Sequence, residues 1–394
     1  MKIAIMTSGI LPVPAVQGGA VENLIDFYMQ YNEKYRLHDI TVYSVYNRKV
    51  ASHHVLRSEV NHYFYIDANS LWAKIKRSIF LHTTYDRAGT YNNHYIEYYF
   101  EKVLKHIRKA NYDIIIMENR PSFAIKLRKH TKAKLICHLH NELLNINTRG
   151  AIEIYNSLDR IITVSNYITN SVKTINPKDK KCITVYNGIN LQAFRMNRIS
   201  IIKREDIGLI PEDFVLVFSG RMNLEKGILE LIKAMNIIKD KKNIKLLVIG
   251  GSFFGNDIQD NNFITDLKTI ASPIHEQIIF TGFVPYERIP DYLKISDVAV
   301  IPSIWNDPFP TTVLEAQAMG LPIIATRNGG IPEEVSNNNA ILLETNDHFI
   351  ESLAEAIIWI YEHSEERGKM GESSLINSTK FNKERFAKDF FKAL

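Results

Sequence analysis

The chain has 394 residues, 45% of them hydrophobic and 23% charged, a composition typical of globular proteins rather than disordered or fibrous ones. This length allows two domains of ordinary size, each with its own core. Two cysteines, Cys137 and Cys182, argue against a disulfide framework and fit a reducing cytosol. The apolar N-terminus stops at Gly9 and Pro12, too soon for a signal peptide, and no apolar run approaches the roughly 20 residues that span a bilayer. We therefore expect a cytoplasmic protein.

The net charge of +5 hides an asymmetry between the two halves of the chain. Residues 1–200 hold 28 Lys and Arg against 15 Asp and Glu, whereas residues 201–394 hold 20 against 28. The basic residues of the first half include two clusters: Lys74, Lys76 and Arg77, with Trp72, Ile75 and Phe80 among them, and Lys126, Arg128, Lys129, Lys132 and Lys134. Such clusters would suit an anionic membrane surface, at about 1 kcal/mol per basic residue near the lipid, or form an ordinary solvated face. No nucleic acid partner is expected, because no binding motif accompanies the charge.

In chain order, short β-branched runs alternate with amphipathic segments, a pattern typical of parallel sheets with crossover helices. The strands expected in the first half are Lys2–Thr7, Ile40–Val45, Asp113–Met117, Lys134–His138, Arg160–Val164 and Cys182–Tyr186. The helices expected there are Ala20–Tyr35, Asn93–Ala110 and Asn166–Thr174.

The same alternation starts again in the second half. Its expected strands are Phe214–Ser219, Ile244–Ile249, Gln277–Thr281, Asp297–Ile301 and Pro322–Ala325. Its expected helices are Gly227–Ile238, Phe263–Ala271, Tyr286–Lys294, Thr311–Met319, Asp347–Glu362 and Lys383–Leu394.

The segment from Asn187 to Pro211 separates the two halves and has the turn and mixed polar residues of a linker. We therefore expect an α/β protein with two doubly wound, Rossmann-like parallel-sheet domains, residues 1–195 and 205–375, followed by a C-terminal helical segment, residues 376–394. Ligands of open parallel sheets bind beyond the carboxyl ends of the strands. The informative residues should therefore lie in strand-to-helix loops, which face a cleft between the two sheets.

The segment Asp297–Val335 gives the strongest indication of a site. A strand is followed by a loop that carries Asp307 and then by a helix that begins near Thr311. The free N–H groups at a helix start, with the hydroxyls of Thr311 and Thr312, can bind an anion. Asp307 and Glu315 can accept hydrogen bonds from hydroxyls of one ligand. A carboxylate beside a helix start can also simply stabilise the helix dipole.

A second indication lies in Phe214–Gly227, where a buried strand ends at Gly220 and two cations, Arg221 and Lys226, follow before a helix. A planar guanidinium and a compact ammonium together suit a diphosphate. They could offset the charge of a pyrophosphate leaving group without a metal. The alternative is a pair of solvated cations, but positive charge is unfavourable at a helix start, which favours the functional interpretation.

The first half gives weaker indications. Gly18 and Gly19 follow the first strand and precede a helix, where glycines let a ligand approach the backbone, although a plain turn explains them equally well. His140 closes the run LICHLHNEL, and His138 shares its face by strand alternation, so either could point toward a ligand. A structural role for both histidines also stays open.

Several motifs are missing from the sequence. No GxGxxG follows the first strand, which removes the main support for a dinucleotide oxidoreductase. The GxxxxGK[ST], HExxH and GxSxG motifs and cysteine pairs with metal-ligand spacing are absent as well. Kinase, metalloprotease and hydrolase functions are therefore not supported, and no metal site is expected.

With Arg221 and Lys226 upstream, the signature Asp307-PFPTTVL-Glu315 resembles that of the retaining glycosyltransferases of family 4, which have the GT-B fold. The family usually has Glu at both ends, so the first acid is shortened to Asp here. The resemblance implies that Glu315 binds the donor ribose and that Asp307 contacts the donor sugar. An Asp reaches less far by one methylene, which could alter sugar identity or activity.

The resemblance extends over nearly the whole chain and implies further roles. Arg221 and Lys226 would bind the diphosphate, and the final helix would cross back to the N-terminal, acceptor-side domain. The segment TGFVPYERIPDYL is similar to the family's nucleobase-contacting stretch, and His140, followed by Asn141, matches its donor-sugar histidine. The expected catalytic residues are Arg221, Lys226, Asp307 and His140. The expected substrate-binding residues are Gly18, Gly19, Gly220, Phe283, Val284, Phe309, Thr311, Thr312 and Glu315.

The opening LPVPAVQGGAVENL is similar to a subgroup of bacterial polysaccharide and spore-coat transferases. The implied function is metal-independent, retaining transfer from a UDP- or GDP-linked sugar to a saccharide or lipid-linked acceptor in surface polysaccharide or glycoconjugate synthesis. No cofactor besides the donor is implied, and the enzyme could be peripheral on the inner membrane face. The alternatives are a nucleotide-sugar epimerase on the same fold and an inert scaffold or coat protein.

Overall fold

The computed structural model describes residues 1–52, 58–68, 94–195, 200–251 and 262–394. The chain forms two compact units. Unit 1 comprises Met1–Tyr186 and Phe386–Leu394, and unit 2 comprises Asn187–Arg385. The basic cluster Lys74, Lys76 and Arg77 and the apolar residues among it lie outside the described residues.

Unit 1 is built on a seven-stranded, all-parallel sheet with the order β3-β2-β1-β4-β5-β6-β7. Its strands are β1 (Lys2–Met6), β2 (Asp39–Val45), β3 (Asn61–Ile66), β4 (Ile114–Glu118), β5 (Lys134–Leu139), β6 (Arg160–Thr163) and β7 (Cys182–Thr184). In β1, Ile3, Ala4, Ile5 and Met6 are all fully buried, as expected for a parallel strand covered on both faces.

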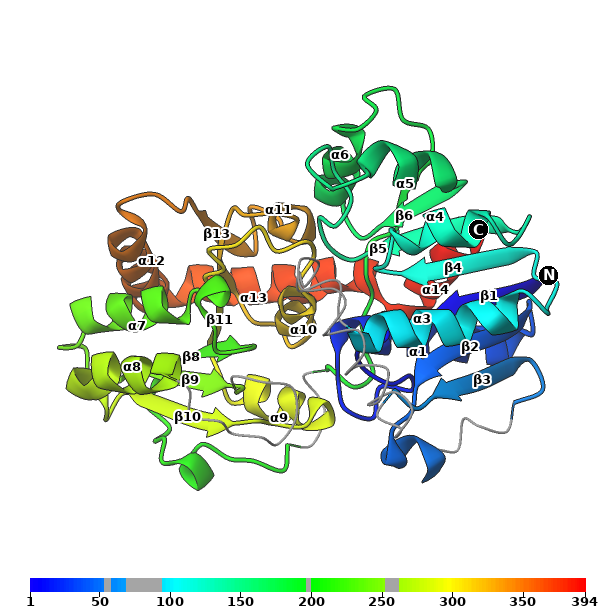
Figure 1. The fold of residues 1–394 in the computed structure, drawn as a ribbon. Coiled ribbons are helices and arrows are strands. Elements are labelled where there is room, and N and C mark those ends of the chain that lie inside the picture. The colour runs from blue at the N-terminus through cyan, green and yellow to red at the C-terminus, as the bar shows by residue number, and fades with distance from the viewer. Residues whose placement is uncertain (53–57, 69–93, 196–199, 252–261) are drawn as a thin grey trace. The chain divides into compact units, whose positions relative to one another are not determined.

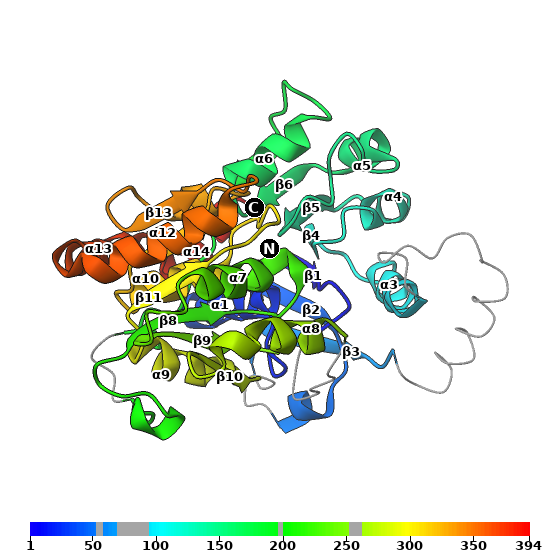
Figure 2. The same cartoon turned by 90° about the vertical axis from the view of Figure 1, so that its left-hand side faces the viewer.

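The helices of unit 1 are α1 (Ala20–Tyr35), α3 (His94–Ile107), α4 (Phe123–Arg128), α5 (Ala151–Ser157), α6 (Asn166–Lys173) and most of α14 (Lys383–Lys392). α1 and α14 share one core with the inner strands, in which Phe386 and Phe390 of α14 are fully buried. In Figure 2, α3, α4 and α5 lie on the other side of these strands from α14. The end of the chain therefore completes the core of the unit that contains its beginning.

Unit 2 has a six-stranded, all-parallel sheet with the order β10-β9-β8-β11-β12-β13 (Figure 1). Its strands are β8 (Phe214–Ser219), β9 (Ile244–Ile249), β10 (Ile278–Gly282), β11 (Val298–Ile301), β12 (Ile323–Thr326) and β13 (Ala340–Leu343). Its helices are α7 (Ile228–Ile237), α8 (Asn262–Ala271), α9 (Ile289–Lys294), α10 (Thr311–Ala318), α11 (Ile331–Glu334), α12 (Phe349–Glu362) and α13 (Ser364–Ser378). α7, α8 and α12 pack with the sheet in one apolar core.

The structure adds elements that the sequence pattern did not predict. The edge strands β3 and β13, the short helices α4, α5 and α11, and the polar helix α13 were not expected. The segment expected at 376–394 is divided between the units, because residues 376–385 belong to unit 2 and 386–394 to unit 1. Cys182, at the start of an expected strand, is only partly buried, because β7 is a short edge strand.

A helix must be long and apolar to cross a bilayer. None of the helices in the described part of the chain meets both conditions.

Candidate active site

The loops after β8 and β11 are packed together at the carboxyl end of the unit 2 sheet, where these two strands are neighbours. Gly227 has φ +70°, and a Cβ there would overlap the carbonyl oxygen of Pro302. The Ser303 hydroxyl and the Ile304 N–H donate to the carbonyl of Glu225, at 3.2 and 3.0 Å. The loop that carries Lys226 is thereby fixed against the loop that carries Asp307.

Lys226 and Asp307 form an ion pair between these two loops. Their side chains are 23% and 8% exposed. The Asn223 side chain accepts a hydrogen bond from the Lys226 N–H at 3.2 Å and so caps the short 3₁₀ turn Leu224–Lys226. The residues that the resemblance assigned to the diphosphate and to the donor sugar are therefore in direct contact.

The backbone of Asp307 is held from the other side by the turn after β12. Its carbonyl accepts a hydrogen bond from the Gly330 N–H at 2.8 Å. Gly329 has φ +61°, and a Cβ there would overlap the Asp307 backbone. This glycine pair, which was not singled out from the sequence, determines the position of the acid.

The helix α10 begins shortly after Asp307, with Pro310 as its N-cap and Thr311 and Thr312 as its first residues. Pro310 has no side-chain acceptor, so the first N–H groups of α10 keep the anion-binding capacity of a helix start. Phe309 is buried, and its carbonyl accepts a hydrogen bond from Asn187 at 3.2 Å. The backbone around the helix start is therefore fixed within unit 2.

Glu315 lies one turn inside α10 and is 4% exposed. Burial raises its pKa to about 7, against hydrogen bonds with the Thr311 and Tyr286 hydroxyls that lower it. Burial, the charge of Glu315 and the hydrogen bond to it raise the pKa of Tyr286 well above its ordinary value. Tyr286 was not predicted as a site residue, although it lies in the segment that resembles the family's nucleobase-contacting stretch.

The remaining residues predicted for unit 2 also follow strand ends. Gly220 and the exposed Arg221 come directly after β8, and the half-buried Phe283 and Val284 directly after β10. Gly220 has φ +154°. Its carbonyl oxygen lies so close to Gly250 that a Cβ added at Gly250 would overlap this oxygen. Since parallel strands end at the same edge of a sheet, these residues share an edge with Lys226 and Asp307.

In unit 1, Gly18 and Gly19 form the turn that leads into α1. Their φ angles are +77° and +106°, and Gly19 is the N-cap of α1. A Cβ at Gly19 would overlap the carboxylate of Glu22, whereas no atom lies within 4 Å of a Cβ at Gly18. Gly19 is therefore required by local packing, whatever ligand this turn contacts.

Both predicted histidines contact one buried carboxylate, that of Glu118 at the end of β4. His140 Nε2 lies 2.8 Å and His138 Nδ1 3.0 Å from the same Glu118 oxygen. The side chains of Glu118 and His138 are fully buried, and that of His140 is 7% exposed. The possible ligand atoms of the three residues lie within 4.8 Å of one another, a spacing that direct contact with the carboxylate explains without an ion. Glu118 was not predicted, because nothing in the run IIIMENRP connects it with histidines that follow on the next strand.

The basic cluster at residues 126–134 is partly engaged within unit 1. Lys126 pairs with Glu97 at 3.1 Å, Arg128 with Asp159, and the Lys134 ammonium contacts the Leu394 carbonyl. Lys129 and Lys132 are exposed. The basic face is therefore smaller than the sequence suggests.

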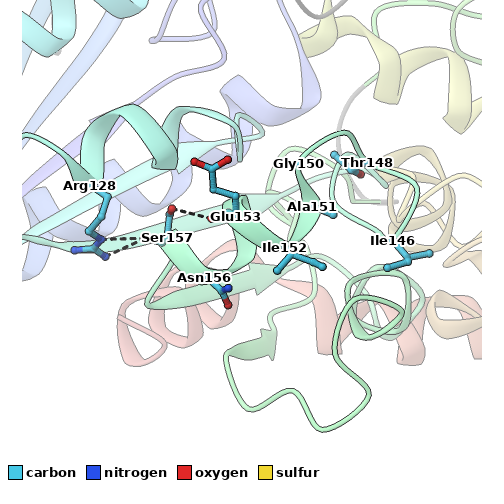
Figure 3. Close-up of a pocket in the computed structure, with 9 residues that line it drawn as sticks. All are labelled: Arg128, Ile146, Thr148, Gly150, Ala151, Ile152, Glu153, Asn156 and Ser157. Atoms are coloured by element: carbon cyan, nitrogen blue, oxygen red, sulfur yellow. Dashed lines mark hydrogen bonds between the residues drawn. The ribbon is translucent and has the colours of Figure 1, made fainter.

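A pocket of about 800 Å³ lies beside α5 in unit 1 (Figure 3). It is lined by Arg128, Ile146, Thr148, Gly150, Ala151, Ile152, Glu153, Asn156 and Ser157. Arg128 donates to the Ser157 carbonyl, and the Ser157 hydroxyl donates to the Glu153 carbonyl. None of the residues predicted for the donor lines this pocket.

Comparisons of the sequence with known proteins identify a family. The model of "Glycosyl transferases group 1" matches residues 200–375, and that of "Glycosyltransferase Family 4" matches residues 82–193. Spore coat protein SA of Bacillus subtilis is 30% identical over 95% of this chain and 93% of its own.

Solved structures share the fold. A glycosyltransferase from Rickettsia africae has a TM-score of 0.75 at 20% identity, over 99% of this chain and 97% of its own. Anabaena Alr3699/HepE in complex with UDP and glucose has a TM-score of 0.74 at 19% identity, over 100% and 98%. Two parallel sheets with flanking helices, shared along the whole chain with these proteins, define a GT-B fold, and the two family models with the Bacillus subtilis relative define a glycosyltransferase. The chain belongs to the family 4 glycosyltransferases.

Proposed function

We propose that this glycosyltransferase moves a sugar, with retention of configuration, from a UDP- or GDP-linked donor to a saccharide or lipid-linked acceptor in surface polysaccharide or glycoconjugate synthesis. One observation carries the proposal: two cations, an acid and an open helix start lie on adjacent strand ends of unit 2. The solved relative that holds UDP and glucose supports a nucleotide-sugar donor.

The leaving diphosphate would be stabilised by Lys226, Arg221 and the start of α10. Charge stabilisation aimed at a leaving group is usually the largest catalytic contribution. Two cations and a helix dipole can supply this stabilisation from the protein itself, which supports the proposal that no metal is needed. Phe283 and Val284 would contact the base, and Glu315 the ribose.

Asp307 and His140 would contact the donor sugar. The ion pair with Lys226 would hold Asp307 where the diphosphate and the sugar meet. Its pairing also makes Asp307 a poor nucleophile, which supports attack by the acceptor hydroxyl on the same face as the departing phosphate. Gly18 and Gly19 would border the substrate on unit 1.

The test is nucleoside diphosphate release from purified protein with a panel of UDP and GDP sugars and oligosaccharide acceptors. Release that depends on an acceptor, a product linkage with the anomeric configuration of the donor, and persistence in EDTA are expected. Conversion of the donor without an acceptor would instead identify an epimerase. Nucleotide binding without turnover would identify a scaffold protein.

We also propose that unit 1 contacts an anionic membrane surface. Among the described residues, Lys129 and Lys132 support this contact, because both are exposed. Lys126 and Arg128 of the same cluster are instead engaged in ion pairs within unit 1. Flotation with anionic vesicles tests it, and binding that does not weaken with salt would contradict it.

A further inference from the structure

The ends of β4 and β5 are locked to each other around Glu118. The two strands are parallel neighbours, with Glu118 in register with His138. Asn119, in the left-handed region at φ +58°, donates its N–H to the His138 carbonyl at 2.8 Å. Its side-chain oxygen accepts the His140 N–H at 3.2 Å. These hydrogen bonds fix the backbone of the two strand ends that carry Glu118 and His140.

Glu118 has a distinct contact on each carboxylate oxygen. The Tyr28 hydroxyl donates to Oε1 at 2.7 Å, and His140 Nε2 lies 2.8 Å from Oε2. His138 Nδ1 is 3.0 Å from Oε2, but neither ring nitrogen of His138 has hydrogen-bond geometry to a described residue. The hydrogen bonds with good geometry to Glu118 therefore come from Tyr28 and His140, and the His138 ring lies beside the same carboxylate.

The ionisation states of these groups agree with that pattern. Burial opposes ionisation of Glu118, but the two imidazoles outweigh it and lower the pKa of this carboxyl below its ordinary value. Burial and His138 lower the pKa of His140 to about 4, against the effect of Glu118. Burial and Glu118 raise the pKa of Tyr28, so it keeps its proton. At neutral pH a neutral His140 faces an ionised Glu118.

An ionised carboxylate only accepts hydrogen bonds. The single ring proton of a neutral His140 must therefore lie on Nε2, where it is donated to Glu118. His140 Nδ1 then carries a lone pair, and no described residue donates a hydrogen bond to it.

We infer that Glu118 is a positioning residue, which holds His140 as the Nε2–H tautomer so that Nδ1 accepts a hydrogen bond from a sugar hydroxyl. The identity of that ligand rests on the proposed function. The inference adds the direction of the hydrogen bond to the proposed function: the sugar hydroxyl must donate to His140 Nδ1. A sugar that lacks this hydroxyl therefore loses the contact.

The C-terminal helix supports this arrangement. The Tyr28 ring stacks on Phe390 of α14 with centroids 4.2 Å apart and planes 3° apart. Phe390 is fully buried and also lies 5.3 Å from the His138 ring. The last turns of the chain therefore orient the phenol that donates to Glu118.

The first test does not depend on activity. Nuclear magnetic resonance of protein labelled with ¹⁵N-histidine, assigned by comparison with His140→Ala, reports which ring nitrogen of His140 carries the proton. A protonated Nε2 and a bare Nδ1 at pH 7 are expected. An Nδ1–H tautomer or an imidazolium would overturn the inference. So would a stoichiometric metal in elemental analysis, removable by EDTA with a change in the His140 signals.

The second test separates positioning from a general structural role. Glu118→Gln removes the charge that holds His140 and should lower kcat roughly 10- to 100-fold, with nucleoside diphosphate affinity unchanged. In a His140→Ala background the same substitution should have no further effect on kcat, because the two residues act as one unit. A similar loss in both backgrounds would contradict positioning through His140.

Tyr28→Phe should have a milder effect than Glu118→Gln, because it removes one hydrogen-bond donor to Glu118 and keeps the ring that stacks on Phe390. A several-fold loss of kcat is expected, again absent in the His140→Ala background. Tyr155→Phe is the matched control, since the Tyr155 hydroxyl donates to Asp179 elsewhere in unit 1. Equal losses in the two tyrosine variants would count against the inference. If no transfer is detected with any donor, the proposed function fails while the tautomer measurement stands by itself.

Discussion

The two units hold their candidate site residues in different ways. In unit 2 the residues lie on loops, where backbone hydrogen bonds and close glycine contacts fix an ion pair that keeps some exposure to solvent. In unit 1 a fully buried carboxylate fixes two histidines and is oriented by a tyrosine that belongs to the apolar core. Polar backbone contacts determine the first site, and core packing determines the second. A substitution should therefore have a different effect on stability and activity in each unit.

The largest effect is expected from Phe390→Ala, which removes a fully buried ring from the core of unit 1. Truncation of a buried Phe to Ala costs about 3–5 kcal/mol. Chemical denaturation should show this loss, with nucleoside diphosphate affinity unchanged, since the residues proposed to bind the nucleotide lie in unit 2. Phe391→Ala, on the same helix but only partly buried, is the control and should cost less. Equal losses would show that burial of the Phe390 ring is not what stabilises the core of unit 1.

Lys226→Ala should act on chemistry in unit 2. Loss of one group that stabilises transition-state charge typically lowers kcat about 10²- to 10³-fold. The same change leaves Asp307 without its partner, so the stability of unit 2 should fall, and adding Asp307→Asn should restore stability without restoring transfer. Lys242→Ala, an exposed lysine of the same unit, is the control. Unchanged diphosphate release in Lys226→Ala would contradict the proposed role.

Glu315 gives unit 2 a pH dependence. Its folded pKa of about 7 lies above the ordinary value of 4.5, so the unfolded state releases this proton first as the pH rises. The contribution of Glu315 to stability should thus be present below about pH 4.5 and be lost by about pH 7, a change of roughly 3 kcal/mol. Denaturation of wild type and Glu315→Gln across this range measures it. A constant difference between the two proteins would contradict the raised pKa.

Gly19→Ala tests how tightly the turn before α1 is packed. The substitution forces Ala to φ +106° and displaces the Glu22 carboxylate, at an expected cost of about 1–3 kcal/mol. Gly18→Ala meets no neighbouring atom and should cost only the conformational part, about 1 kcal/mol. Denaturation midpoints compare the two. A larger loss at Gly18 would show that the packing at Gly19 is not what requires glycine.

The smallest effects are expected at the basic face of unit 1. Lys129→Ala and Lys132→Ala should each weaken binding to anionic vesicles by about 1 kcal/mol, roughly fivefold. Lys242→Ala in unit 2 serves as the control here as well. Vesicle flotation at low and high salt measures binding. Equal binding by all three variants would show that Lys129 and Lys132 do not contact the membrane and only face solvent.

Much of the fold follows from the sequence pattern. The expected segments Ala20–Tyr35, Phe214–Ser219 and Ile244–Ile249 match α1, β8 and β9 at both ends. The edge strands were missed for local reasons. β3 begins with the polar Asn61 and His62 and is mostly only partly buried, and β13 consists of four partly buried residues between polar segments.

Helix α13 was missed for a different reason. Its sequence SEERGKMGESSLINS has no apolar stripe, and several of its contacts are polar. The Ser374 hydroxyl donates to the Leu321 carbonyl at 2.7 Å, and the Asn377 amide to the Glu334 carbonyl at 2.8 Å. Gly371 allows close approach to the Gly320 backbone. Partners that are dozens of residues away leave no local pattern.

The sequence by itself determined the alternation of strands and helices and the candidate site residues, because periodicity and motif spacing are local properties of the chain. Only the tertiary structure decided which side chains meet: Lys226 with Asp307, Glu118 with His140, and Tyr28 with Phe390. These contacts join segments that are far apart in the chain, and they form because sheet order and core packing bring strand ends and the last helix together. Such proximity is a property of the folded chain and cannot be predicted from any one segment.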